Sequence, residues 1–187
     1  MELILASNSP RRKELLQKYG VQFKVIVSDY EEKVCSDNPI ETAVEFATGK
    51  ARCVFKSLSS KDNKVVLGAD TVVYHDGKIL GKAQTEEMAI EMLKSLSGKT
   101  HSVITGYALI SKNKTITGHC ESKVKFNNLN KEIINEYVKS GLYKGKAGSY
   151  GIQDGYALVE KHTGSYENIV GLPAQEIISI LNEFSKV

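Results

Sequence analysis

The segment ILASNSPRRKELL, residues 4–16, decides the fold class of the chain. Its apolar beginning belongs to the run ELILAS, residues 2–7, which predicts a short buried strand. Ser9 is placed to cap a helix, Pro10 suits the first helical position, and Gly20 suits the C-terminal stop. A strand followed at once by a helix is typical of α/β proteins.

The rest of the chain continues this alternation of strands and helices. Strands are predicted at residues 22–28, 64–80 (a pair around the turn HDG), 100–110 and 121–129. Helices are predicted at residues 38–58, 85–98, 130–141 and after Pro173, and the Gly-rich segment 148–173 is predicted to be β-like. We therefore expect an α/β fold with a mixed, twisted sheet and flanking helices, in one domain (residues 1–187) of two lobes around a cleft.

Composition narrows the class of function. With 41% hydrophobic and 25% charged residues, the chain suits a packed domain rather than a disordered one. The net charge of +3 is too balanced for a general nucleic-acid binder, so any basic site must be local. No run predicts a membrane span or a secretory signal. The distant cysteines Cys35, Cys53 and Cys120 disfavour disulfides and zinc, so we expect a cytoplasmic protein.

Two arginines, Arg11 and Arg12, lie in the first turn of the first predicted helix, where the backbone is already positive. Unpaired N–H groups at a helix start, preceded by small polar residues such as Ser7, bind anions. The two guanidinium groups would complete a phosphate pocket with charge-assisted hydrogen bonds. Alternatively, both arginines are solvated at an exposed helix start, and this segment alone does not separate the two interpretations.

Carboxylates occur in two places that could carry chemistry. SDYEEK, with Asp29, Glu31 and Glu32, is either a cluster around a hard cation such as Mg²⁺ or a polar loop. Asp70 lies within the apolar run VVLGADTVV, and buried carboxylates usually have a partner or a metal. Asp70 is therefore a candidate metal ligand or a base acting on water, and the alternative is that it caps a turn.

Lysines and glycines complete the set of candidates. Lys50 in TGKAR and Lys82 in ILGKA follow small residues and suit phosphate, although lysine is abundant here. GKAGSYGIQDG places Lys146, Gln153 and Asp154 among glycines that permit close approach to a ligand. A glutamine can read a base edge with a donor and an acceptor together, but a bulged hairpin explains this segment equally well.

Together the motifs resemble those of the Maf proteins, a family of nucleoside triphosphate pyrophosphatases. The motifs are LILASNSPRRKELL, EEK, KAR, GADTVV, LGKA, MLKSLSGKTHSVIT, KAGSYGIQ and VGLP, which occur in family order over almost the whole chain. The resemblance implies an elongated fold shared with the inosine triphosphate pyrophosphatases, with a cleft between two lobes. It also implies hydrolysis of a nucleoside triphosphate to the monophosphate and pyrophosphate, with Mg²⁺ or Mn²⁺.

The resemblance assigns roles to individual residues. Asp70 is the expected proton acceptor and, with Glu32, the expected metal ligand; Lys82 and Glu32 assist it in catalysis. The family's basic positions match Arg11, Arg12, Lys50 and Lys82. The expected reaction is metal-assisted attack of water on the α-phosphorus, while the basic residues and the helix start hold the other phosphates. Ala83 departs from the family, which normally has proline there.

At three motif positions the chain resembles the branch of the family that acts on dTTP and UTP. These positions are Arg11, Thr71 and Gln153. Thr71 and Gln153 are expected to read the pyrimidine, and the sister branch, which prefers 7-methyl-GTP, differs at these positions. A different class of function is a non-catalytic nucleotide sensor, because Maf proteins are associated with arrest of septum formation. The family resemblance makes a homodimer plausible. RNA binding is disfavoured, because the sequence has no basic stripe interleaved with aromatic residues.

Overall fold

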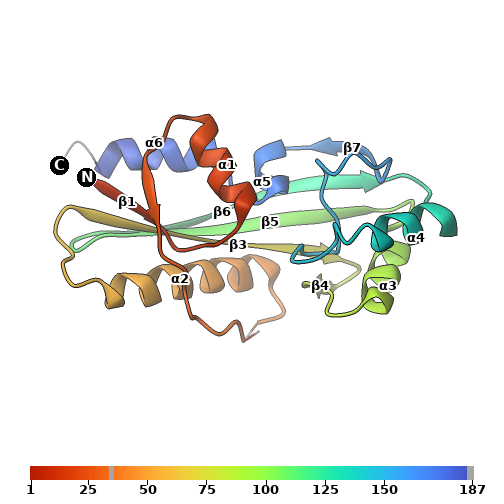
Figure 1. Cartoon of the computed structure of the whole chain (residues 1–187), viewed down its shortest axis with the longest axis horizontal. Coiled ribbons are helices and arrows are strands. Elements are labelled where there is room, and N and C mark those ends of the chain that lie inside the picture. The colour runs from red at the N-terminus through yellow and green to blue at the C-terminus, as the bar shows by residue number, and fades with distance from the viewer. Residues whose placement is uncertain (34–35, 185–187) are drawn as a thin grey trace.

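The computed structural model describes residues 1–33 and 36–184, and it shows an elongated molecule built around one long sheet (Figure 1). The strands are β1 (Glu2–Leu5), β2 (Phe23–Val25), β3 (Lys64–His75), β4 (Lys78–Leu80), β5 (Thr100–Ile110), β6 (Thr115–Phe126) and β7 (Val159–Thr163). The helices are α1 (Pro10–Lys18), α2 (Pro39–Ser57), α3 (Glu86–Leu96), α4 (Lys131–Lys139), α5 (Tyr166–Val170) and α6 (Ala174–Phe184).

The sheet contains both parallel and antiparallel pairs. Its strand order is β2-β1-β3-β5-β6-β7, and β4 pairs with one end of β3. β1 runs parallel to β2 and β3, because α1 carries the chain back between β1 and β2, whereas the remaining pairs are antiparallel. The predicted α/β fold with a mixed sheet and flanking helices is confirmed.

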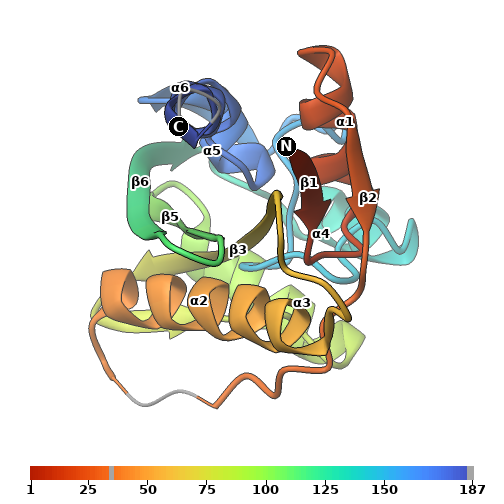
Figure 2. The same ribbon diagram turned by 90° about the vertical axis from the view of Figure 1, so that its left-hand side faces the viewer.

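Helices cover both faces of the sheet (Figure 2). Successive residues of a strand point to opposite faces, so β1 contributes to two cores. Leu3 and Leu5 pack with Leu16 of α1 and Ile177 of α6, whereas Ile4 packs on the other face with α2. A further core joins α3 and α4 to the far ends of β5 and β6. The alternating apolar pattern of the short first strand therefore fixes which helices lie on which side.

Two glycines of the central strands bring α2 close to the sheet. A Cβ atom at Gly68 would lie 2.1 Å from the carbonyl oxygen of Ala47, and one at Gly106 would lie 2.3 Å from the carbonyl carbon of Ala43. A side chain at either position would collide with the helix backbone, so close approach requires glycine. The helix consequently lies directly on β3 and β5, and this places Lys50 beside the middle of β3.

The Gly-rich segment 148–173 differs most from its prediction. It contains the strand β7, but turns and the short helix α5 form most of the rest. Gly155 and Gly164 have φ angles of 78° and 89°, which interrupt an extended strand, and Ser165 caps α5 with its side chain. The β-like prediction is therefore wrong for most of this segment. β6 also begins earlier than predicted, at Thr115, because it pairs along all of β5.

Residues without a predicted chemical role are mostly structural or on the surface. Cys53 and Cys120 are free thiols, and Cys35 lies outside the described residues. His75 and His101 are buried near one another, with ring centroids 6.5 Å apart. Across residues 1–33 and 36–184, no helix has both the length and the apolar character needed to cross a membrane.

Candidate active site

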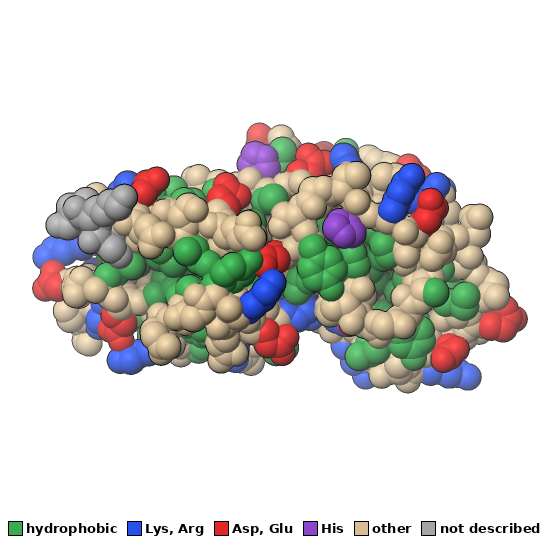
Figure 3. All heavy atoms as spheres, turned by 90° about the horizontal axis from the view of Figure 1, so that it is seen from above, with side chains coloured by type: hydrophobic (Ala, Val, Ile, Leu, Met, Phe, Trp, Pro, Cys, Tyr) green, Lys and Arg blue, Asp and Glu red, His purple; other side chains and the backbone are tan. Residues whose placement is uncertain are grey.

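A cavity of about 450 Å³ lies where the start of α1, the strand β3 and residues 144–153 meet. On the face drawn in Figure 3, acidic and basic side chains lie side by side in the middle of the elongated molecule as well as at its two ends. Among the described residues, one acidic residue, Asp70, lines the cavity together with six basic residues, namely Arg11, Arg12, Lys50, Lys82, Lys144 and Lys146. Such an excess of positive charge around a concave site favours the binding of a polyanion.

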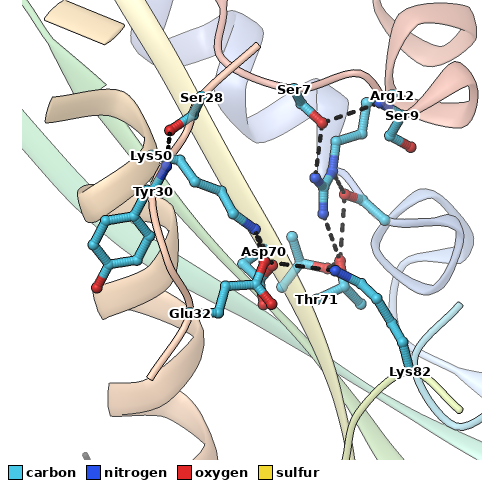
Figure 4. Close-up of polar contacts among 12 residues, drawn as sticks. Ser7, Ser9, Arg12, Ser28, Tyr30, Glu32, Lys50, Asp70, Thr71 and Lys82 are labelled. Carbon is cyan, nitrogen blue, oxygen red and sulfur yellow. Dashed lines mark hydrogen bonds and ion pairs between the residues drawn. The ribbon is translucent and has the colours of Figure 1, made fainter. Parts of the chain in front are cut away.

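Asp70 lies in the middle of β3, and its side chain is only 6% exposed. Its Oδ1 accepts a hydrogen bond of 2.5 Å from Nζ of Lys50 on α2 (Figure 4). The interpretation in which Asp70 caps a turn is wrong, because the residue belongs to a continuous strand paired with β5 at Gly106. A carboxylate inside a core strand needs such a charged partner, which is what Lys50 supplies.

Glu32 reaches the same lysine from the irregular segment after β2. Its Oε1 lies 2.5 Å from Nζ of Lys50 and 3.5 Å from Nζ of Lys82 (Figure 4). Burial acts to raise the pKa of Glu32, but the hydrogen bond and charge of Lys50, assisted by Lys82, outweigh burial and lower that pKa. Lys50 therefore bridges two carboxylates, whereas Glu31 pairs with Lys33 on the surface.

The two arginines at the start of α1 are explained by the end of another helix. Nε of Arg12 donates to the carbonyl of Gly171 at 2.9 Å, and Nε of Arg11 donates to the carbonyl of Val170 at 3.2 Å. These carbonyls belong to the last residue of α5 and to its C-cap, and unpaired carbonyls at a helix C-terminus attract cations. Burial lowers the pKa of Arg12, against the charge of Asp70. The arginines thus join α1 to α5 as well as lining the cavity.

Arg12 is bound on its other side by two hydroxyl groups. Its Nη1 donates to Oγ of Ser7 at 3.1 Å, and its Nη2 donates to Oγ1 of Thr71 at 3.3 Å (Figure 4). Thr71 also shares a 2.9 Å hydrogen bond with Thr105. The terminal nitrogens of Arg11 have no hydrogen bond to any described residue, so Arg11 is the arginine with donors left for a ligand.

The segment 144–153 forms the opposite wall and is held by a second buried ion pair. Lys146 and Asp154 contact each other directly, and Oη of Tyr137 donates to Oδ2 of Asp154 at 2.6 Å. The same Oη accepts from the backbone N–H of Gly151 at 3.1 Å. Gln153 is exposed on this wall, and its Nε2 lies 3.3 Å from Oδ1 of Asp154. The wall is therefore fixed by polar contacts from α4.

The aromatic ring of Tyr30 packs against Gly49 of α2, and this contact holds the segment that carries Glu32. A Cβ atom at Gly49 would lie 2.3 Å from the ring of Tyr30, so the ring lies directly on the backbone of α2. The backbone N–H of Tyr30 donates to Oγ of Ser28 at 3.1 Å within the same segment (Figure 4). Glycine inside a helix costs about 1 kcal/mol relative to alanine. Here it provides space for the ring, one residue before Lys50.

Residues 2–184 match the family described as Maf-like protein. The chain belongs to the Maf family. A relative from Clostridium tetani named dTTP/UTP pyrophosphatase is 46% identical, over 98% of this chain and 97% of its own length. A relative of the same name from Pyrococcus abyssi is 45% identical, over 96% and 94%. The structure of the Staphylococcus aureus Ham1 protein matches 67% of this chain and 72% of its own with a TM-score of 0.47 and 17% identity, too weak a likeness for any conclusion.

Most of the residues that were predicted to form the site lie around this one cavity. The cavity is lined by the predicted residues Ser7, Arg11, Arg12, Lys50, Asp70, Thr71, Lys82 and Gln153, and Glu32 contacts two of their lysines. The residues that support them were not predicted. Tyr30 and Tyr137 are ordinary aromatic residues in the sequence, and only Gly49 inside a predicted helix signals an unusual contact.

The carboxylates that could hold a metal ion are few. Among residues 1–33 and 36–184, no group of three or more His, Cys, Asp and Glu side chains is arranged around one point. Glu32 and Asp70 do converge, because both contact Nζ of Lys50. Mg²⁺ commonly takes one or two carboxylates and completes its shell with water and substrate phosphates. These two carboxylates therefore fit a hard divalent cation that arrives with a phosphorylated ligand.

Proposed function

We propose that this Maf protein hydrolyses dTTP and UTP to the monophosphate and pyrophosphate. The observation that carries the proposal is Lys50, which bridges Glu32 and Asp70 at the edge of a strongly basic cavity. The names of the relatives, dTTP/UTP pyrophosphatase at 45–46% identity, support the same activity. In the reaction, water forms a bond to the α-phosphorus, and the bond from that phosphorus to the bridging oxygen of pyrophosphate breaks.

The basic residues hold the triphosphate. A nucleoside triphosphate carries about four negative charges, and phosphoryl-type transfer depends mainly on charge compensation and positioning. Arg11 and Lys82 are the residues best placed to contact phosphate oxygens, since the donors of Arg12 are largely bound within the protein. The N-terminal turn of α1 adds backbone N–H groups on the same side of the cavity.

Asp70 accepts a proton from the attacking water. An ionised carboxylate has only acceptors, so a water molecule beside Asp70 directs its proton to the carboxylate and its lone pair away from it. Lys50 holds Asp70 in place through its hydrogen bond and links it to Glu32. Glu32 and Asp70 would hold Mg²⁺ or Mn²⁺, which when bound neutralises phosphate charge and makes water more acidic.

The proposed substrate and the free cysteines indicate the compartment in which the enzyme works. A free nucleotide is a soluble substrate that requires neither a membrane nor a nucleic acid. Free thiols such as Cys53 and Cys120 suit a reducing compartment, so the proposal places the enzyme in the cytoplasm. A symmetric homodimer is part of the proposal on the strength of the family resemblance, and light scattering coupled to gel filtration tests it.

The decisive experiment is to measure pyrophosphate release from dTTP, UTP, CTP, the purine triphosphates and 7-methyl-GTP. Each substrate is tested with Mg²⁺, with Mn²⁺ and with a chelator. We expect metal-dependent turnover of dTTP and UTP above the purines. Turnover of 7-methyl-GTP alone would overturn the pyrimidine preference, and tight binding of nucleotides without any turnover would favour a nucleotide sensor instead.

A further inference from the structure

The side chain of Asp154 is placed to control the base-reading amide of Gln153. Asp154 follows Gln153 in the chain, and its Oδ1 lies 3.3 Å from Nε2 of that residue. A carboxylate has acceptors and no donor, so the amide atom that faces it must be the NH₂ group. The orientation of the Gln153 amide thus follows from the chemistry of its neighbour.

Asp154 itself is held rigidly. Its Oδ2 accepts a hydrogen bond of 2.6 Å from Oη of the buried Tyr137 and contacts the ammonium group of Lys146. Its backbone N–H donates to the carbonyl of Gly151 at 3.2 Å, which closes a tight turn around Gln153. With Oδ2 engaged by two partners, Oδ1 is the oxygen that remains for the amide.

Gly151 shows how closely the two side chains fold over this turn. A Cβ atom at Gly151 would lie 2.7 Å from both carboxylate oxygens of Asp154 and 2.7 Å from Nε2 of Gln153. Any side chain at this position would separate the pair or displace it. The turn therefore places a carboxylate and an amide together beside the cavity that contains Arg11.

We infer that Asp154 fixes the orientation of the Gln153 amide and thereby selects uracil and thymine over cytosine. The inference rests on the proposed function and on the expectation from the family resemblance that Gln153 reads the base. With Nε2 directed at Asp154, Oε1 remains as an acceptor and one N–H remains as a donor. Uracil and thymine offer the matching pair, a donor at N3–H and an acceptor at the adjacent carbonyl.

Cytosine requires the opposite arrangement. Its N3 is an acceptor and its exocyclic amino group is a donor, so the amide of Gln153 would have to exchange its oxygen and nitrogen positions. That exchange would direct Oε1 at Oδ1 of Asp154, which brings two acceptors together with no proton between them. Asp154 is therefore a positioning residue whose effect is measured by the ratio of UTP to CTP turnover.

The test compares kcat/KM for UTP and CTP in the wild type and in Asp154→Asn. In this variant, Tyr137 and Lys146 retain the amide oxygen of residue 154, so its NH₂ group faces Gln153 and turns Oε1 toward itself. We expect the UTP/CTP ratio to fall about tenfold or more. In a Gln153→Ala background the same substitution should leave the ratio unchanged, which a merely structural role of Asp154 would not predict.

Two further measurements keep the inference falsifiable. If Asp154→Asn fails to fold because Lys146 loses its partner, the double variant Lys146→Met with Asp154→Asn removes that charge, and the same fall in ratio is expected. A folded variant with an unchanged ratio, or a wild type that does not distinguish UTP from CTP, overturns the inference. If the wild type hydrolyses neither nucleotide, the proposed function fails. Calorimetric affinities for non-hydrolysable UTP and CTP analogues then test the inference separately, and equal affinities overturn it.

Discussion

Two lysine–carboxylate pairs lie on opposite walls of the cavity, and they differ in exposure and in connection. Lys50 is shared by Asp70 and Glu32, and the side chain of Glu32 is 34% exposed on an irregular segment. Lys146 contacts the single carboxylate of Asp154, and both side chains are almost fully buried. Lys50 and Asp70 are themselves buried almost as deeply as Lys146 and Asp154, so the first cluster is open to a ligand through Glu32, whereas the second is closed by α4 and its own turn.

The different surroundings of the two lysine–carboxylate pairs indicate that the pairs have different roles. A lysine between two carboxylates can give up one partner when a polyanion or a cation enters, because the other partner still balances its charge. A buried single pair has no such reserve, since removal of one member leaves an isolated charge in a low-dielectric environment. We therefore expect substitutions at the Lys50 pair to affect turnover, and substitutions at the Lys146 pair to affect stability and specificity.

The largest effect is expected from Asp70→Asn. Loss of a general base typically lowers the rate by about 10²–10⁴-fold, and the neutral amide keeps the shape of the side chain. Turnover of dTTP should fall within this range while the affinity for a non-hydrolysable analogue, measured by calorimetry without divalent metal, changes little. Asp76→Asn, on the exposed turn after β3, is the matched control and should retain activity. Full activity of Asp70→Asn would refute the assignment of the base.

The closed pair should show the opposite balance between stability and activity. Asp154→Ala leaves Lys146 buried without a counter-charge, so the free energy of unfolding should fall by about 3–5 kcal/mol. Glu32→Gln should lower it by about 1 kcal/mol or less, because Glu32 is partly exposed and leaves Lys50 paired with Asp70. Urea unfolding of both variants measures the contrast. Equal losses would mean that the two walls do not differ in this way.

A buried histidine next to the closed wall makes stability depend on pH. Burial, together with the charge of His75, lowers the pKa of His101 to about 3. Its Nε2 lies 2.7 Å from Oη of Tyr150, which lines the cavity. The unfolded chain binds a proton at His101 near pH 6.5, whereas the folded chain does not. The contribution to stability is therefore complete above pH 6.5 and is lost progressively as the pH falls toward 3.

Between pH 6.5 and pH 5 this loss amounts to about 2 kcal/mol for one histidine. His101→Gln removes the titrating group, so its free energy of unfolding should fall less over that interval than the wild-type value. The exposed His162→Gln variant is the control and should follow the wild type. Identical pH profiles for wild type and His101→Gln would show that His101 titrates normally in the folded protein.

The parts of the site that were predicted depend on local patterns. Asp70 stands out because a charge inside an apolar strand is rare, and Pro10 and Gly20 mark the ends of a helix within a few residues. The resemblance to the Maf family then predicted further residues that line the cavity, such as Lys82 and Gln153. Such signals are local because periodicity, caps and turns are properties of neighbouring residues.

The parts that were missed depend on contacts between distant residues. Arg11 and Arg12 bind carbonyls 159 positions away, at the end of a helix that lies in a segment predicted to be β-like. Tyr137 reaches Asp154 only because α4 packs beside the turn that carries it. No spacing in the sequence encodes these contacts, because they arise from packing of separate elements. The sequence suggested either phosphate binding or solvation for the two arginines, whereas the structure adds a third role, the connection of α1 to the end of α5.

The smallest expected effect tests how the open wall is held. Gly49→Ala should improve helix propensity by about 1 kcal/mol, but the new methyl group would displace the ring of Tyr30 and with it Glu32. We expect turnover to fall about tenfold, or about 1.4 kcal/mol in activation free energy, with little loss of stability. Hydrogen exchange of residues 26–33 should become faster in the same variant, whatever the substrate.

A double-mutant cycle separates this steric effect from a general defect of the helix. In a Tyr30→Ala background there is no ring to displace, so Gly49→Ala should leave turnover unchanged and show only the gain in helix stability. Thr48→Ala, on the preceding position of α2, controls for any change in the helix itself. If Gly49→Ala were equally harmful with and without the ring, Glu32 would be held by other contacts. The open wall would then owe its geometry to the contacts of Glu32 with Lys50 and Lys82, and the contrast between the two pairs would lie in exposure rather than in how each is supported.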